Sequence, residues 1–309
     1  MSNSCIPFYW TPSTIDSLEP IRIVCIIGMI IHGLFWIQFF LFSKLREISL
    51  IWLFSYLITD LILFIRFFLL FGIRSSSICL DSLARDILCY FEASSKFYLY
   101  TVQAYLILGF NICRYKRIVS NQNIYVEKVR WIILSHLLIY VLPIINVIVQ
   151  FVSQLARISR RRGASCDILY NMLFVQIFNV VITYVFPVFF NLIVIGLAIR
   201  FVSSVEGVTS QQIIHLRQKR QRILLIQTIV FYTIWLFSWS PDFIAFQFIY
   251  VHSDPGIITS LLSHINTALD PILIGILDVR FLTPLKTRCK RMKRNQKIGT
   301  IQPTVNKKN

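Results

Sequence analysis

The chain alternates between long apolar stretches and short polar links. Seven of the apolar stretches reach the length of about 20 residues that a helix needs to cross the hydrocarbon core of a bilayer. Backbone groups inside lipid must be hydrogen-bonded within their own segment, so each stretch is predicted to be a helix. The pattern predicts an all-α membrane protein, a seven-transmembrane helix bundle. The stretches are Ile21–Phe42, Ser49–Phe71, Ile87–Cys113, Trp131–Val152, Ile168–Ile199, Ile223–Phe248 and Ile257–Leu277.

The links are too short to hold a separate soluble domain. We expect an N-terminal segment at residues 1–20, a transmembrane domain at residues 21–293 and a polar tail at residues 294–309. Asp278–Lys293 places Phe281, Leu282 and Leu285 among basic residues, which predicts a short amphipathic eighth helix at the membrane surface. The basic run His215–Arg222 enters the sixth stretch without a helix breaker, so that helix is predicted to extend beyond the bilayer.

Composition agrees with lipid as the solvent, because 56% hydrophobic residues and a mean hydropathy of +0.67 exceed the values usual for a soluble domain. The net charge of +17 is explained by orientation rather than by nucleic-acid binding. With the N-terminus outside, 22 of the 31 basic residues fall on the cytoplasmic side, as the positive-inside rule requires. We expect a multi-pass protein of the plasma membrane. Ile158–Arg162 breaks the rule, either as a solvated basic loop or as an entrance for an anionic ligand.

The seven cysteines divide according to this orientation. Cys5, Cys79, Cys89 and Cys166 face the oxidising side, where four thiols allow two disulfides. Cys289 follows the last stretch in a basic segment, so it is a candidate either for palmitoylation or for a free thiol.

Several short motifs occur in a fixed order along the apolar stretches. Cys89 opens the third stretch, and Arg114-Tyr115 follows 25 residues later. The sixth stretch contains Trp239-Ser-Pro241, and the seventh contains Asp270-Pro271. In order and interval these motifs resemble those of the rhodopsin-like (class A) G-protein-coupled receptor family, over nearly all of Ile21–Lys293. The chain looks like a divergent, orphan-type member.

The resemblance implies roles for these residues. It implies a disulfide between Cys89 and Cys166, and it implies contact with a heterotrimeric G protein through Arg114 and Tyr115. It also implies an activation switch. Proline inside a helix removes a hydrogen bond and bends the helix, which would let its inner half move. The implied switch residues are Trp239, Pro241, Asp270 and Pro271.

An internal ion site is also implied. Asp60 lies in the second stretch, where an unpaired carboxylate is costly and usually functional. Asp60, Asn266 and Asp270 correspond to members of the family's sodium site, and the two carboxylates would hold either sodium or a shared proton. No other cofactor or metal is expected.

The ligand pocket is expected among the outer halves of the third, fifth, sixth and seventh stretches. Its candidate residues are Lys96, Tyr100, Trp239 and His264. Lys96 stands where aminergic receptors have aspartate, which favours a peptide or an anionic small molecule over a monoamine. Glu92, one helical turn away, could instead pair with Lys96 and leave it without a ligand role.

These patterns predict a receptor that binds an extracellular ligand and activates a heterotrimeric G protein, with the lipid bilayer as its other partner. A transporter or channel is the competing class. An enzyme is not expected, because no metal-ligand pair or activated nucleophile is apparent. A receptor that does not couple to G proteins also stays open, because Cys113 and Ile274 replace an acidic residue and a tyrosine of the family pattern. Ligand identity, G-protein subtype and oligomeric state are left undetermined.

Overall fold

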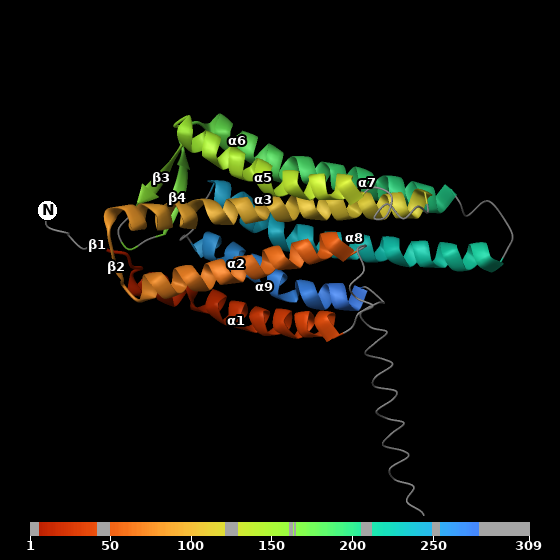
Figure 1. Ribbon diagram of the computed structural model, residues 1–309, viewed down its shortest axis with the longest axis horizontal. Helices are drawn as coiled ribbons and strands as arrows, with labels where there is room; N and C mark the ends of the chain where they lie inside the picture. The colour runs from red at the N-terminus through yellow and green to blue at the C-terminus, as the bar shows by residue number, and fades with distance from the viewer. Residues whose placement is uncertain are drawn as a thin grey trace, which may run out of the picture.

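The described residues of the computed structural model form a bundle of long helices with two small two-stranded sheets at one end (Figure 1). The described residues are 6–41, 50–120, 129–160, 163, 165–204, 212–248 and 254–277. The helices are α1 (Pro12–Leu41), α2 (Ile51–Ser75), α3 (Ser82–Ser120), α5 (Val129–Val152), α6 (Leu173–Val180), α7 (Phe186–Ser204), α8 (Gln212–Phe248) and α9 (Asp254–Leu277). The strands are β1 (Ile6–Pro7), β2 (Cys79–Leu80), β3 (Ala156–Arg160) and β4 (Cys166–Tyr170).

Both sheets are antiparallel, and both lie at the same end of the bundle. Strand β1 pairs with β2 so that Pro7 is opposite Cys79, and β3 pairs with β4 so that Ile158 is opposite Ile168. A hydrogen bond of 3.0 Å from the Thr11 N–H to the Gly163 carbonyl ties the N-terminal segment to the turn of the β3–β4 hairpin. The N-terminal segment therefore connects the two sheets.

The helices are long and apolar enough for a multi-pass membrane protein. In the described part of the chain, six helical segments meet the length and hydropathy expected of a membrane span, with α6, α7 and the turn between them counted as one. Helix α3 is not among them, because Gln103 and Asn111 interrupt its apolar run. It packs against α2, α5 and α7, so its polar side chains face protein.

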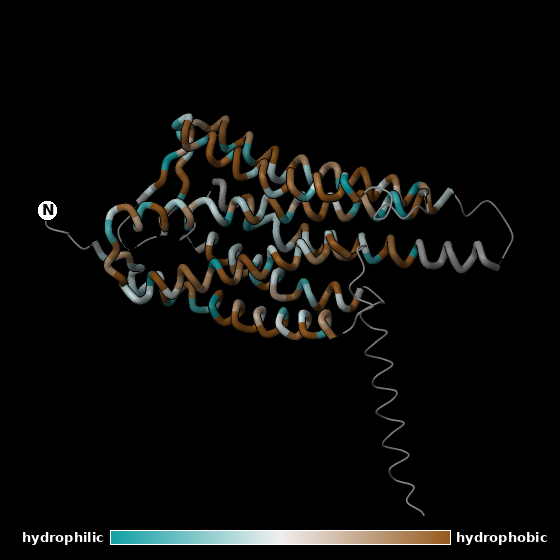
Figure 2. The backbone as a smooth tube through the Cα atoms, viewed as in Figure 1, coloured by the Kyte–Doolittle hydropathy of each residue, from teal (hydrophilic) through white to brown (hydrophobic). Residues whose placement is uncertain are grey.

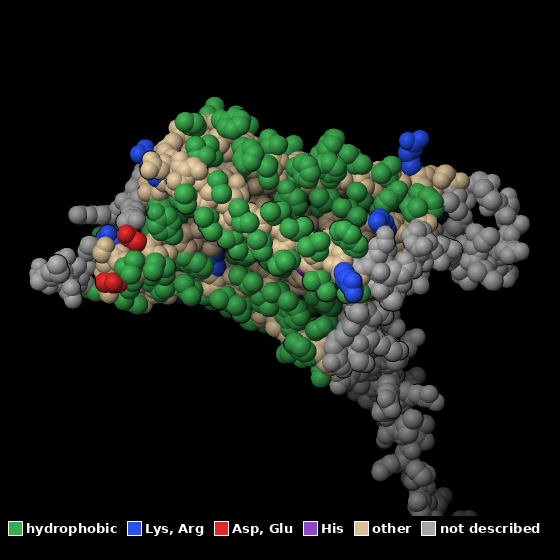
Figure 3. Space-filling view, turned by 45° about the horizontal axis from the view of Figure 1, so that its top comes forward, with side chains coloured by type: hydrophobic (Ala, Val, Ile, Leu, Met, Phe, Trp, Pro, Cys, Tyr) green, Lys and Arg blue, Asp and Glu red, His purple; other side chains and the backbone are tan. Residues whose placement is uncertain are grey.

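The outer surface of the bundle is apolar. Figure 2 shows hydrophobic segments running along the helices, and Figure 3 shows hydrophobic side chains covering most of the visible face. On α5, for example, Ile133, Leu137 and Ile148 are each more than half exposed. Monomeric soluble proteins rarely expose contiguous apolar patches of this extent, whereas lipid solvates them without cost. The chain is an all-α integral membrane protein.

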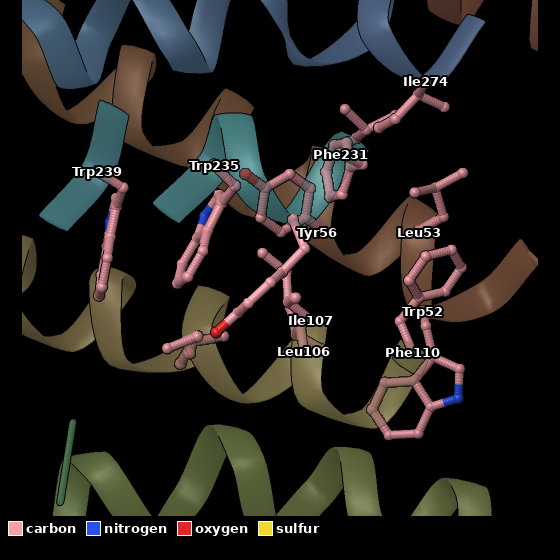
Figure 4. Close-up of a cluster of buried hydrophobic side chains, with 14 of the residues drawn as sticks. Trp52, Leu53, Tyr56, Leu106, Ile107, Phe110, Phe231, Trp235, Trp239 and Ile274 are labelled. Carbon is pink, nitrogen blue, oxygen red and sulfur yellow. The ribbon is translucent and has the colours of Figure 1, made fainter. Parts of the chain in front are cut away.

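The interior holds a column of aromatic side chains that joins α2, α3 and α8 (Figure 4). Its close packing requires glycine at position 109, because a Cβ there would lie 2.4 Å from the Trp52 ring. Ile274 is 3% exposed in the same cluster.

A single π-helical turn, η3 (Val181–Val185), separates α6 from α7. Such a turn contains one extra residue and leaves a carbonyl without its usual helical partner. The Tyr105 hydroxyl of α3 donates a hydrogen bond of 2.8 Å to the Ile182 carbonyl. Tyr184, also in η3, stacks on Trp239 and donates to the Ser240 hydroxyl at 2.8 Å.

Two predicted boundaries were wrong. The first helix begins at Pro12 rather than Ile21, because the Thr11 hydroxyl caps the Thr14 N–H and proline is favourable in the first helical turn. The predicted helix Ile168–Ile199 was wrong at its outer end, because Ile168–Tyr170 pairs with β3 as part of β4. The extension of the sixth helix was correct, since α8 begins at Gln212. The predicted eighth helix, the tail and Cys289 lie outside the described residues.

Candidate functional site

Polar side chains from α3 make contact with other helices at three depths of the bundle. We call these contacts the outer network (Lys96 and Tyr100), the middle site (Gln103) and the inner contact (Asn111 and Arg114). Intervals of three, four and seven or eight residues keep side chains on one side of a helix. One helix thus carries polar contacts from one end of the bundle to the other.

The outer network links α3, α8 and α9. Lys96 Nζ forms an ion pair with Asp242 Oδ1 at 3.1 Å and donates to Ser260 Oγ at 3.3 Å. The Tyr100 hydroxyl donates to the second Asp242 oxygen and lies 2.9 Å from Ser263 Oγ. The Lys96 and Asp242 side chains are only 8% and 3% exposed. Such buried charges are tolerated because they are paired and hydrogen-bonded.

The alternative that Glu92 pairs with Lys96 was wrong. Glu92 forms a buried ion pair with Arg74 of α2, and it accepts a hydrogen bond of 3.1 Å from the Cys166 N–H. The Arg74 guanidinium also stacks over Phe8, 3.7 Å from the ring centroid. Although Glu92 and Lys96 are one turn apart, they face different helices, and each finds its counter-charge there. Asp242 and Arg74 were not among the candidate site residues, although the cost of an unpaired charge in a span predicts such partners.

The predicted disulfide between Cys89 and Cys166 is present, with a Cα–Cα distance of 5.3 Å. It fixes β4 to the outer end of α3, next to Glu92. Cys79 is also disulfide-bonded, while Cys5 lies outside the described residues. Cys25 and Cys113 are buried and are not disulfide-bonded.

A cavity of about 80 Å³ lies beside the outer network. Its lining comes from α1, α2, α3, α9 and the segment around β4, and it includes Lys96 and His264. Tyr100 and Trp239 do not line this cavity, so it contains two of the four expected pocket residues. Tyr184, Trp239 and Phe243 stack together where that pocket was expected, with ring centroids 5.0–5.9 Å apart.

Tryptophans of α8 form a stack below the outer network. The Trp235 and Trp239 rings lie side by side (Figure 4), with centroids 4.5 Å apart. The edge of the Tyr100 ring meets Trp239 at a centroid distance of 5.5 Å. Pro241 lies inside α8, between Trp239 and Asp242. The proposed switch residues Trp239 and Pro241 are therefore next to the only ion pair that joins α3 to α8 among the described residues.

The middle site brings together the residues of the proposed ion site. Gln103 Nε2 donates to Asp60 Oδ1, Tyr56 donates to Asp270 Oδ2 at 2.6 Å, and Asn266 Nδ2 lies 3.3 Å from the same oxygen. Asp60 Oδ2 and Asn266 Oδ1 are buried with no hydrogen-bond partner. Hard cations prefer oxygen ligands of this kind. Asp60, Asn266 and Asp270 therefore fit a sodium ion, which would neutralise one buried carboxylate.

The inner contact holds Arg114 against α8. Arg114 Nη1 donates to Thr228 Oγ1 at 2.7 Å, and the guanidinium lies over the Phe110 ring at 4.3 Å. Tyr115 lines a small cavity next to Arg114 and Thr228. Cys113 carries no charge that could hold Arg114. The neutral Thr228 hydroxyl of α8 accepts a hydrogen bond from Arg114 instead.

Comparison with protein-family models gave no match for this chain, and comparison with curated proteins gave none either.

Proposed function

We propose that this protein is a receptor of the rhodopsin-like G-protein-coupled class, placed in the plasma membrane with its N-terminus outside. In this proposal α3 is the seventh membrane span, and a ligand at the outer network changes the contacts of a heterotrimeric G protein at Arg114 and Tyr115. The order of the motifs, the Cys89–Cys166 disulfide and the excess of basic residues on one side support it.

The observation that carries the proposal is the double connection between α3 and α8. Lys96 binds Asp242 at the outer end, and Arg114 binds Thr228 at the inner end. About 14 residues of α8 separate the two contacts, which corresponds to about 21 Å. A change in the position of α8 would therefore alter both the outer and the inner contact. Allosteric coupling requires such an element, whose two positions affect both sites.

The outer connection is the place where a ligand would act. Asp242 follows Pro241, which cannot donate a helical hydrogen bond, so the helix is weakest beside the ion pair. A ligand that competes for Lys96 or Ser260 would alter this end of α8. The stacked Trp239 and Trp235 would carry the displacement toward Thr228 because packed side chains move together.

The inner connection sets the basal state. A single hydrogen bond to a charged group contributes about 1.5–3 kcal/mol, less than a buried ion pair costs to break. Release of Arg114 from Thr228 would let it meet a G-protein partner. We expect measurable basal activity, because the Thr228 hydroxyl that holds Arg114 against α8 is a neutral acceptor and is easily exchanged.

The test is nucleotide exchange by a panel of purified heterotrimeric G proteins with the receptor in lipid nanodiscs. Thr228→Val should raise basal exchange about threefold or more, given the energy of the lost hydrogen bond. Arg114→Gln should abolish exchange. Arg117→Gln is the matched control, because Arg117 is an exposed cation in the last turn of the same helix.

The proposal fails if no G protein responds and neither Thr228→Val nor Arg114→Gln changes any signal. Ion and solute flux in proteoliposomes would then test the transporter or channel class. Flux that Asp60→Asn abolishes would assign the middle site to transport.

A further inference from the structure

We infer that Arg66 of α2 binds the carboxylate of a small organic acid inside the outer cavity. A small organic acid would then be the ligand class of the proposed receptor. Only the effect of binding on G-protein activation rests on the proposed function.

Two cations line the cavity, Arg66 of α2 and Lys96 of α3. A third, Arg74 of α2, is paired with Glu92 of the lining. Glu92 is paired with Arg74, and Asp242 is paired with Lys96. These are the two carboxylates whose charges act on Arg66. Both are already bound by another cation.

Arg66 has only neutral acceptors among the described residues. Its Nε donates to Ser95 Oγ, and its Nη2 donates to the Glu92 carbonyl at 2.7 Å. It forms no ion pair there. A guanidinium stays charged at any physiological pH, and an uncompensated charge at the depth of a membrane span is costly. Such a charge is a functional site by default, and an anion would stabilise it.

The geometry suits a carboxylate better than a point anion. Ser95 and the Glu92 carbonyl hold two of the three guanidinium nitrogens and so fix the plane of the group. The five N–H donors of arginine form a planar fork, and a carboxylate can accept two of them side by side. Donors remain for such a pair, because the two observed hydrogen bonds use only two of the five.

Asp167 of β4 is a further acidic group in the cavity lining. Its charge acts on Arg74, at the outer end of α2. Arg66 is eight residues deeper in the same helix, about 12 Å along its axis. Asp167 therefore belongs to the outer wall, together with the Arg74–Glu92 pair.

The space limits the size of the ligand. A water molecule needs about 10–15 Å³ of such volume, so a cavity of about 80 Å³ admits a group of a few heavy atoms. Trp10, Ile21, Phe67 and Leu70 add an apolar wall. A short aliphatic or aromatic carboxylate matches this combination of one cation and an apolar surface.

The position also explains how the ligand would reach the switch. Ser260 lines the cavity and accepts a hydrogen bond of 3.3 Å from Lys96. A molecule bound to Arg66 therefore lies beside the Lys96–Asp242 pair without having to break an ion pair to bind. Lys96 was first expected to bind the anion. In this arrangement Arg66 binds it, and Lys96 responds through its contacts with Ser260 and Asp242.

The test is thermal unfolding of the purified full-length protein in detergent with propionate, butyrate or benzoate as probes. Propionamide, butyramide and benzamide are the neutral isosteres, and sodium chloride matches ionic strength. At least one carboxylate should raise Tm, and its amide should not. Arg66→Gln should raise the Kd of that carboxylate by about 10-fold or more. Arg157→Gln, which removes an exposed cation of β3, should leave the Kd unchanged.

Arg66→Lys keeps the charge but not the fork, and it covers the case in which Arg66→Gln does not fold. It should weaken carboxylate binding while retaining a preference over the amide. The inference is overturned if no carboxylate raises Tm, if the amides act equally, or if neither Arg66 variant changes the Kd. If dipeptides bind and their C-terminal amides do not, the carboxylate that Arg66 binds is the C-terminus of a peptide.

The two proposals fail separately. Carboxylate binding that depends on Arg66 without any G-protein response would keep this site and refute the receptor mechanism. G-protein activation by another ligand, with no carboxylate binding, would keep the receptor proposal and refute the carboxylate site.

Discussion

Replacing Asp242 by asparagine should leave Lys96 as an uncompensated charge inside the bundle. The Lys96–Asp242 distance of 3.1 Å and the nearly complete burial of both side chains make this a fully desolvated pair. Removing one partner of such a pair costs about 3–5 kcal/mol in the free energy of unfolding. Lys96→Met should cost a similar amount, because it leaves the Asp242 carboxylate with only the Tyr100 hydroxyl.

The double variant Lys96→Met with Asp242→Leu should lose less stability than either single variant. No charge remains unpaired in it, and Tyr100 keeps its contact of 2.9 Å with Ser263. The assay is unfolding in detergent micelles, followed by tryptophan fluorescence for the four members of the cycle. Additive losses in the double variant would refute the ion pair as the dominant interaction of these residues.

A surface pair provides the control for this cycle. Arg85 and Asp86 lie 4.0 Å apart with side chains that are 27% and 34% exposed. Water screens such a pair, so Asp86→Asn should cost less than about 1 kcal/mol. A cost equal to that of Asp242→Asn would mean that burial is not the cause of the effect.

Three further predictions follow from the packing and the buried polar groups. Gly109→Ala should destabilise the fold by about 1–3 kcal/mol in the same unfolding assay, because the new Cβ meets the Trp52 ring, whereas Gly33→Ala, with open space around it, should not. Cys89→Ser should lower stability by about 4 kcal/mol, because the bond closes a loop of 77 residues; an unchanged Tm would contradict a structural role. Sodium chloride should raise Tm relative to choline chloride, and Asp60→Asn should remove the difference; equal Tm values in both salts would exclude sodium at the middle site.

The membrane character and most helix positions could be predicted from the sequence, because apolar length alone decides which segments enter lipid. The start of α1 could have been predicted too, since Thr11-Pro12 is a helix-start signal of a capping residue followed by proline. Strand β4 was harder to predict. Ile168–Tyr170 continues an apolar stretch, and only its pairing with β3 and the disulfide at Cys166 make it a strand.

The partners of the charged residues could not be predicted from spacing. Glu92 and Lys96 fit the one-turn rule for a pair within a helix, yet each binds a residue far away in the sequence. The rotation of α3 relative to α2 and α8 decides which residues Glu92 and Lys96 pair with. No local pattern in a single sequence encodes that rotation. The position of the cavity follows from the same cause, because Tyr184 and Phe243 fill the space next to Trp239.

The π-helical turn η3 has a consequence for how such a protein can change over evolutionary time. Because a turn with one extra residue rotates everything before it by about 100° relative to everything after it, η3 makes α6 and α7 two independently oriented surfaces. Asn179 of α6 binds Gln150 of α5, whereas Asn191 of α7 binds Asn111 of α3. Loss or gain of one residue in Val181–Val185 would present a new set of side chains on α6, at the end of the bundle that carries the two sheets, while α7 kept its contacts. For the proposed receptor, ligand preference could thus diversify through a single codon, with the contacts of α7 left intact.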